Sequence, residues 1–88
     1  MKIKEGFILR EIGGSFVVVA VGNASKHFKG VIKLNDSGAF LWQKLETGNF
    51  NCEELAKELQ NQYDVDEVTA KNDVNEFINN LKEAKIIE

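Results

Sequence analysis

The sequence predicts one α+β domain spanning residues 1–88, with a three-stranded antiparallel sheet followed by three helices. Three observations lead to this prediction. The first third of the chain contains short runs of β-branched and aromatic residues around a Gly-Gly pair, a pattern typical of a β-hairpin. From residue 35 onward, apolar residues recur about every 3.6 positions, as they do in amphipathic helices. A chain of this length has room for one small hydrophobic core.

The sheet is predicted from three apolar runs. Residues 7–12 and 15–22 are expected to form a hairpin, because Gly13-Gly14 between them can adopt the positive φ angles of a tight two-residue turn. The second run is apolar on both faces, which is typical of a strand that is central or covered on both sides. After a polar connection at 23–29, residues 30–35 are expected to form a third, shorter strand. The simplest arrangement is a meander with the second strand in the middle.

The first helix is predicted between a capping cluster and a glycine. Asn35, Asp36 and Ser37 are all good N-cap residues, and Gly48 lies where the helix should end. The apolar face of this helix contains Leu41, Trp42 and Leu45. We interpret Trp42 as a packing residue rather than a platform for a cofactor.

Two further helices follow. Asn51 and Glu54 have the spacing of a capping box at the start of a helix that reaches Tyr63. Asp66 can cap the third helix, and the apolar stripe of that helix consists of Ala70, Val74, Phe77, Ile78 and Leu81. Residues 84–88 are expected to leave the helix, with Ile86-Ile87 folding back onto the core.

The residues needed for catalysis or metal binding are scarce. His27 is the only histidine and Cys52 the only cysteine, so neither a Cys/His metal cluster nor an intramolecular disulfide can be assembled from this chain. No Ser/His/Asp arrangement suggests nucleophilic catalysis. We therefore expect a protein that is not an enzyme and that holds no metal or cofactor.

The hydropathy pattern gives no targeting or membrane segment. The longest apolar run, Phe16 to Val21, has six residues, whereas a membrane-spanning helix needs about 20. Arg10 and Glu11 interrupt the N-terminal apolar run before it reaches the length of a signal-peptide core. We expect a cytoplasmic protein.

The charges are distributed unevenly along the chain. Residues 1–48 carry seven Lys/Arg and four Asp/Glu, a net charge of +3, whereas residues 49–88 carry four and ten, a net charge of −6. A winged helix-turn-helix DNA-binding protein could be built from the same elements, but such a protein needs Lys/Arg to neutralise phosphates. The acidic second half argues against DNA and favours a peptide or protein partner. The alternative is that these are ordinary solvated surfaces.

Three consecutive stretches resemble the PqqD-like family, also described as RiPP recognition elements. They are "LNDSGAFLWQKLETG", "EELAKELQNQYDVD" and "AKNDVNEFINNLKEAKII". The matching positions are Leu34, Asn35, Gly38, Ala39, Leu41, Trp42, Leu55, Leu59, Tyr63, Asp64, Val65, Asp73, Val74, Phe77 and Leu81. One departure is visible: the family has a glycine just before the final apolar pair, where this chain has Lys85. The exit geometry of the third helix is therefore left open.

The resemblance implies a three-stranded antiparallel sheet packed on three helices, in a winged-helix style that does not bind DNA. It also implies a function. Such domains bind the leader segment of a ribosomally made precursor peptide and present it to a modifying enzyme, often a radical SAM enzyme. The leader adds a strand beside the third strand, in a groove bordered by the third helix. A protein-interaction or regulatory domain with the same fold and a different partner is the alternative.

The sequence gives this binding mode a physical basis. In a meander whose second strand is central, the third strand is an edge with free N–H and C=O groups that an extended peptide can pair with. We expect Ile32 and Leu34 to face inward, and Val31 and Lys33 to face outward. Lys26, Lys29 and Lys33 would attract acidic residues of a leader, although edge lysines also serve to prevent aggregation. A free edge can equally pair with a second copy of the chain.

On the third helix, Phe77 and Leu81 are predicted to form the apolar floor of the groove. Asp73 and Asn80 flank this floor on one side, and Lys71 and Lys82 on the other. We predict that the Asp73/Asn80 side meets the strand, although periodicity alone does not distinguish the two sides. The predicted peptide-binding residues are Lys29, Gly30, Val31, Ile32, Lys33, Leu34, Asp73, Phe77, Asn80 and Leu81.

Overall fold

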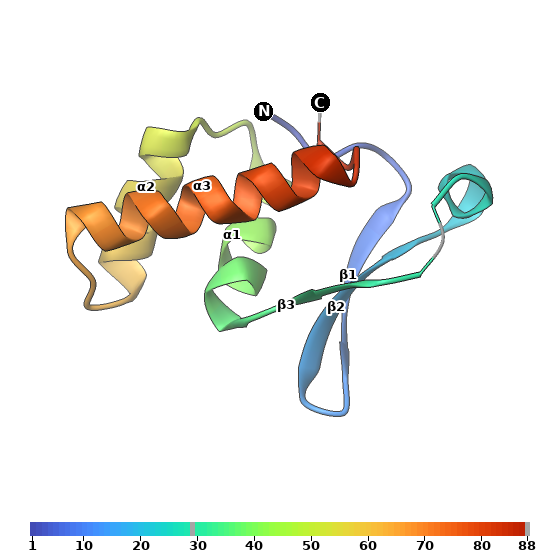
Figure 1. Ribbon diagram of the computed structural model, residues 1–88, viewed down its shortest axis with the longest axis horizontal. Coiled ribbons are helices and arrows are strands. Elements are labelled where there is room, and N and C mark those ends of the chain that lie inside the picture. The colour runs from blue at the N-terminus through green and yellow to red at the C-terminus, as the bar shows by residue number, and fades with distance from the viewer. Residues whose placement is uncertain (29, 88) are drawn as a thin grey trace.

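A computed structural model describes residues 1–28 and 30–87. Its sheet consists of β1 (Phe7–Ile12), β2 (Ser15–Ala20) and β3 (Ile32–Leu34), arranged antiparallel in the order β1-β2-β3 (Figure 1). The predicted meander with a central second strand is therefore confirmed. The hairpin turn is also confirmed, because Gly13 and Gly14 both have positive φ angles, of 57° and 81°.

Two strands are shorter than the sequence predicted. β2 ends at Ala20 rather than at residue 22, because Gly22 adopts a φ of 61° and begins a 3-10 helix, η1 (Gly22–Lys26). β3 covers only Ile32–Leu34 rather than 30–35, and Gly30 before it has a φ of 92°. Positive φ angles do not fit an extended strand. Gly22 lies two positions after the end of β2, and Gly30 lies two positions before the start of β3.

The sequence predicted only that the connection between β2 and β3 is polar, and the structure shows that it contains η1. This turn packs beside the start of the chain. The Phe28 ring lies edge-on to the Phe7 ring with 5.4 Å between centroids. Gly6, with a φ of 97°, makes room for the turn, because a Cβ at this position would lie only 2.7 Å from the Cβ of Ala24.

The helices begin at the predicted caps. α1 (Asp36–Thr47) follows Asn35, whose side chain accepts a hydrogen bond from the Gly38 N–H at 2.8 Å. α2 (Cys52–Gln62) begins with the predicted capping box between Asn51 and Glu54. α3 (Glu67–Glu83) is capped by the carboxylate of Asp66. Each cap satisfies a backbone donor that has no partner inside its helix.

The core lies between the helices and one face of the sheet, while the β1–β2 hairpin projects away from the helical layer (Figure 1). Its largest fully buried side chains are Trp42, Leu41, Leu55, Leu59, Leu81, Ile86, Val18 and Val74. Trp42 is thus a packing residue, as predicted, and its indole N–H has no acceptor among the described residues. Val18 is the fully buried residue of β2, with Val17 and Val19 on either side only half-buried.

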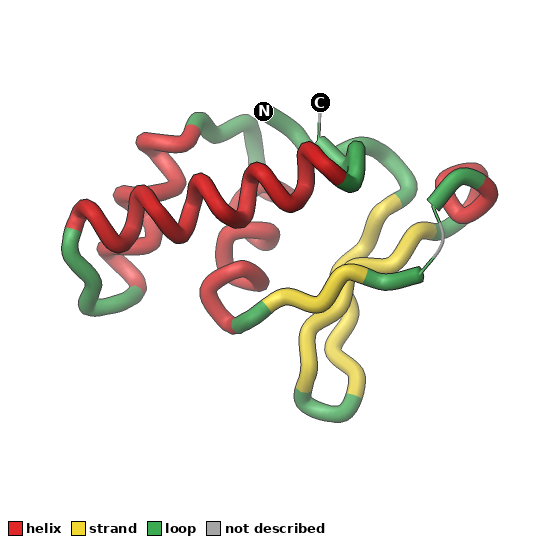
Figure 2. The backbone as a smooth tube through the Cα atoms, viewed as in Figure 1, coloured by secondary structure: helices red, strands yellow, loops and turns green. Residues whose placement is uncertain are grey.

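The C-terminal tail closes the core. Ile86 is fully buried, and its carbonyl accepts a hydrogen bond of 2.7 Å from the Lys4 N–H. Ile3 and Ile87 form an antiparallel bridge, so the two ends of the chain lie side by side (Figure 2). The prediction that the two isoleucines fold back onto the core is confirmed. Among the described residues, no helix is long and apolar enough to cross a bilayer.

Candidate functional site

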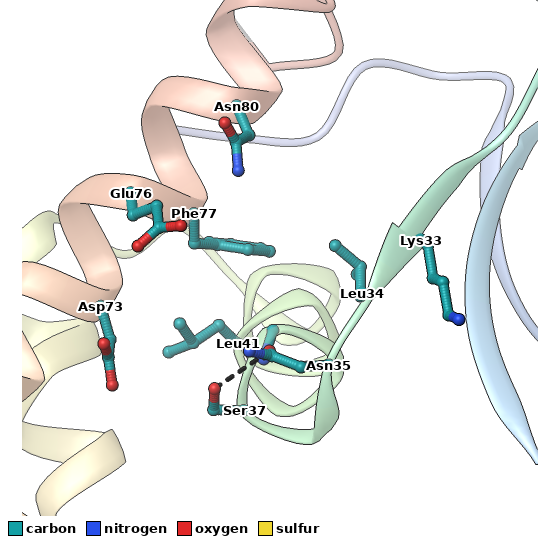
Figure 3. A pocket seen from close by; sticks show the side chains of 10 residues that line it. Lys33, Leu34, Asn35, Ser37, Leu41, Asp73, Glu76, Phe77 and Asn80 are labelled. Atoms are coloured by element: carbon teal, nitrogen blue, oxygen red, sulfur yellow. Dashed lines mark hydrogen bonds between the residues drawn. The ribbon is translucent and has the colours of Figure 1, made fainter.

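A groove of about 200 Å³ separates α3 from the junction between β3 and α1 (Figure 3). We call it the α3–β3 groove. It is lined by Lys33, Leu34, Asn35, Ser37, Gly38, Leu41, Asp73, Glu76, Phe77 and Asn80. One wall is therefore a helix face and the other is the end of an edge strand together with the first turn of a helix.

The helical wall follows from the periodicity of α3. Asp73, Phe77 and Asn80 are separated by four and three positions, which places them on one side of the helix. Phe77 is only 6% exposed, and its ring points across the groove toward Leu34 (Figure 3). The apolar floor of the groove is therefore continuous with the hydrophobic core.

The opposite wall is fixed by the cap of α1. The Asn35 side-chain oxygen accepts hydrogen bonds from the Gly38 N–H at 2.8 Å and from the Ser37 hydroxyl at 3.1 Å. Gly38 allows the strand to pass closely, because a Cβ there would lie 3.1 Å from that oxygen and 3.4 Å from the Cβ of Leu34. The end of β3 is thus held in a defined place against α1.

The charged side chains at the groove come mainly from the helical wall. Asp73 is half-buried and Glu76 is exposed, and among the described residues neither carboxylate forms an ion pair. Lys33 contributes to the rim, but its side chain points away from the groove (Figure 3). The interior of the groove is therefore apolar and acidic rather than basic.

The strand beside the groove has a free edge. Within residues 1–28 and 30–87, β3 pairs with β2 and with no other strand. Val31, just before β3, is 60% exposed. Alternate N–H and C=O groups of an edge strand point away from the sheet and are available to another chain.

The structure brings half of the predicted binding residues together at the groove: Lys33, Leu34, Asp73, Phe77 and Asn80. Gly30, Val31 and Ile32 lie along or just before β3 but do not line the groove. Leu81 is fully buried in the core behind it. Lys29 lies outside the described residues.

Five lining residues were not predicted: Asn35, Ser37, Gly38, Leu41 and Glu76. Four of them belong to the α1 start, which the sequence identified only as a cap and a core face. Glu76 lies next to Phe77 and three positions after Asp73, so the side of α3 chosen from Asp73 and Asn80 could have included it.

The chain is therefore a small α+β domain in which the helices cover one face of a three-stranded meander and the open edge of β3 lies beside α3. The family model described as coenzyme PQQ synthesis protein D (PqqD) matches residues 8–87, and the chain belongs to this family.

Two solved structures share the fold. One is TbiB1 in complex with the TbiA(beta) leader peptide, with 24% sequence identity, coverage of 100% of this chain and 95% of the other, and a TM-score of 0.76. The second is lasso peptide synthetase B1 complexed with the leader peptide, with 20% identity, coverage of 99% of this chain and 95% of the other, and a TM-score of 0.74. No curated protein sequence matches the chain.

Proposed function

We propose that this protein is a non-catalytic adaptor that binds the leader segment of a ribosomally synthesised precursor peptide and presents it to a modifying enzyme. The observation that carries the proposal is the free edge of β3 beside the α3–β3 groove. An extended peptide would gain main-chain hydrogen bonds at this edge and place alternate side chains in the groove. Membership of the PqqD family and the two leader-peptide complexes of the same fold support it.

The proposed binding surface has two parts. Gly30, Val31, Ile32 and the β3 residues Lys33 and Leu34 supply the edge that a leader would extend. Asp73, Phe77 and Asn80 supply the facing helix wall, with Phe77 as the apolar contact at the bottom. Leu81 supports Phe77 from within the core rather than touching the peptide, because it has no exposed surface.

The enzyme partner in this proposal modifies peptides, and a radical SAM enzyme is the class we infer from the family. A protein-interaction domain of the same fold with another partner is the competing function. The same β3 edge would also serve for pairing with a second copy. A leader and a second copy would then compete, because both need the same N–H and C=O groups.

Strand addition is tested with synthetic leader peptides of the precursor encoded beside the gene. A fluorescein-labelled leader is titrated with the protein, and each backbone amide of the leader is then N-methylated in turn. We expect saturable binding, with weakening at every second N-methylated amide over the docked stretch, because only alternate amides of a strand face its neighbour.

Methylation of the intervening amides is the matched control, since it adds the same bulk without removing an inter-strand hydrogen bond. Binding that is insensitive to methylation at all positions would rule out strand addition. No binding of any leader would rule out the adaptor function and favour a different partner.

A further inference from the structure

We propose that the peptide recognised at the β3 edge alternates in charge, with Lys or Arg among the side chains directed into the α3–β3 groove and Asp or Glu among those directed to the opposite face. This inference rests on the proposed function and names the chemistry of its ligand.

The orientation of β3 determines which side chains of a docked peptide face the groove and which face outward. Successive side chains of a strand point to opposite faces of the sheet, and residues directly opposite each other on paired strands point to the same face. Leu34 faces the groove and Lys33 faces away from it (Figure 3). A guest residue beside Leu34 or Ile32 therefore enters the groove, and a guest residue beside Lys33 lies on the outer face.

The groove side is acidic around an apolar centre. Phe77, Leu34 and Leu41 provide the apolar surface. Asp73 and Glu76 line the same wall of α3, and within residues 1–28 and 30–87 no Lys or Arg pairs with either. At the start of α1, the Gly38 N–H already donates to the side chain of Asn35. An apolar side chain accompanied by a cation is the complementary guest.

The outer side is basic. The strand register places Arg10 opposite Val17 and Val17 opposite Lys33, so these three residues form one row across the outer face. A guest residue beside Lys33 becomes the fourth member of this row. Opposite charges on directly paired residues stabilise a sheet, whereas like charges destabilise it. An Asp or Glu at this guest position is therefore favoured over a Lys or Arg.

The experiment is a selection from a displayed library of random 12-residue peptides against three forms of the protein. They are the wild type, Asp73→Asn/Glu76→Gln, and Lys33→Glu. From the wild type we expect enriched peptides with Lys or Arg at alternate positions and Asp or Glu at the positions between them. Peptides selected on the double variant should lose only the enrichment of Lys or Arg at the groove-side positions. Peptides selected on Lys33→Glu should carry Lys or Arg instead of Asp or Glu at the outer-face positions.

The controls carry charge changes of the same kind away from the groove. Glu83→Gln also lies on α3, and Lys57→Glu lies on α2, and neither residue lines the groove. Peptides selected on these controls should keep the wild-type pattern. For one selected peptide, replacing its groove-side cation with Ala should weaken binding to the wild type about two- to fivefold, as for other exposed charge pairs, and leave binding to the double variant unchanged.

The outcomes separate the two proposals. Enriched peptides without alternating charge, or with a pattern unaffected by the groove variants, would overturn this inference and leave strand addition intact. Failure to enrich any peptide on the wild type would overturn the adaptor function itself. Thermal melts that match the wild type show that each variant is folded.

Discussion

At the scale of single residues, Lys85 stands out because it has a φ of 60°. It occupies the left-handed position at the end of α3, where the family resemblance led us to expect a glycine. The Ile86 N–H donates to the Leu81 carbonyl at 2.9 Å, and the Lys85 N–H donates to the Lys82 carbonyl at 3.0 Å. These two bonds, with Leu81 and Ile86 both buried, make a Schellman motif. The departure from the family pattern therefore leaves the exit geometry in place and puts strain on one residue.

Relief of this strain should stabilise the protein. A residue with a Cβ pays about 1–2 kcal/mol in the left-handed region, and glycine loses part of that gain through its greater backbone freedom when unfolded. We expect Lys85→Gly to raise the free energy of unfolding by about 0.5–1 kcal/mol, measured by urea denaturation. The matched control is Lys82→Gly, inside the last turn of α3, which should lower it by about 1 kcal/mol. A lower denaturation midpoint for Lys85→Gly would contradict the assignment.

At the scale of elements, α1, α2 and α3 each start with a side chain that accepts a hydrogen bond from a backbone N–H. These caps are local, because donor and acceptor are three residues apart in each case. The Asn35 cap also sets where the groove forms, because Asn35 is the single residue between the end of β3 and the start of α1. α3 differs from the other two helices in having a charged cap, and its stability should therefore depend on pH.

Asp66 is the titrating cap. The hydrogen bond from the Thr69 backbone N–H, at 2.6 Å, and a further bond with the Thr69 side chain hold the pKa of Asp66 below its ordinary value of 3.8. A lowered carboxyl pKa contributes stability that is present above the ordinary value and is lost as the pH falls through the lowered one.

We therefore expect the wild type to lose more stability than Asp66→Asn between pH 4 and pH 2, because asparagine still caps the helix but does not titrate. Urea denaturation across this range measures the difference. Asp64→Asn makes the same charge change outside the cap and serves as the control. Equal losses for the wild type and Asp66→Asn would show that protonation of Asp66 does not change the free energy of unfolding.

At the scale of the whole molecule, the two chain ends hold the sheet and the helices together. Ile86 and Ile87 leave α3, enter the core and meet the residues just before β1. Residues 1–34 carry six of the seven basic residues of the first half, and most of the acidic residues of the chain lie in the helices that follow. The α3–β3 groove lies where the two parts meet, so its two sides differ in charge.

The tail should matter for global stability. We expect Ile86→Ala to lower the free energy of unfolding by about 2–4 kcal/mol, because it removes buried methyl groups and leaves a cavity. The same type of truncation at Val68, which is 69% exposed, should change it by less than about 0.5 kcal/mol. Thermal unfolding followed by circular dichroism compares the two. Equal effects would mean that the tail does not belong to the core.

Local patterns in the sequence were enough to predict the order of the strands and α-helices, the Gly13-Gly14 turn, the three caps and the apolar faces of the helices. Each of these depends on residues within about four positions of one another, where periodicity and capping rules apply. Three features became clear only from the folded chain: the side of α3 that faces β3, the place of Glu76 and the start of α1 in the groove lining, and the burial of Leu81 behind it. Those facts depend on how elements distant in sequence pack together, and a helix stripe alone does not specify its neighbour.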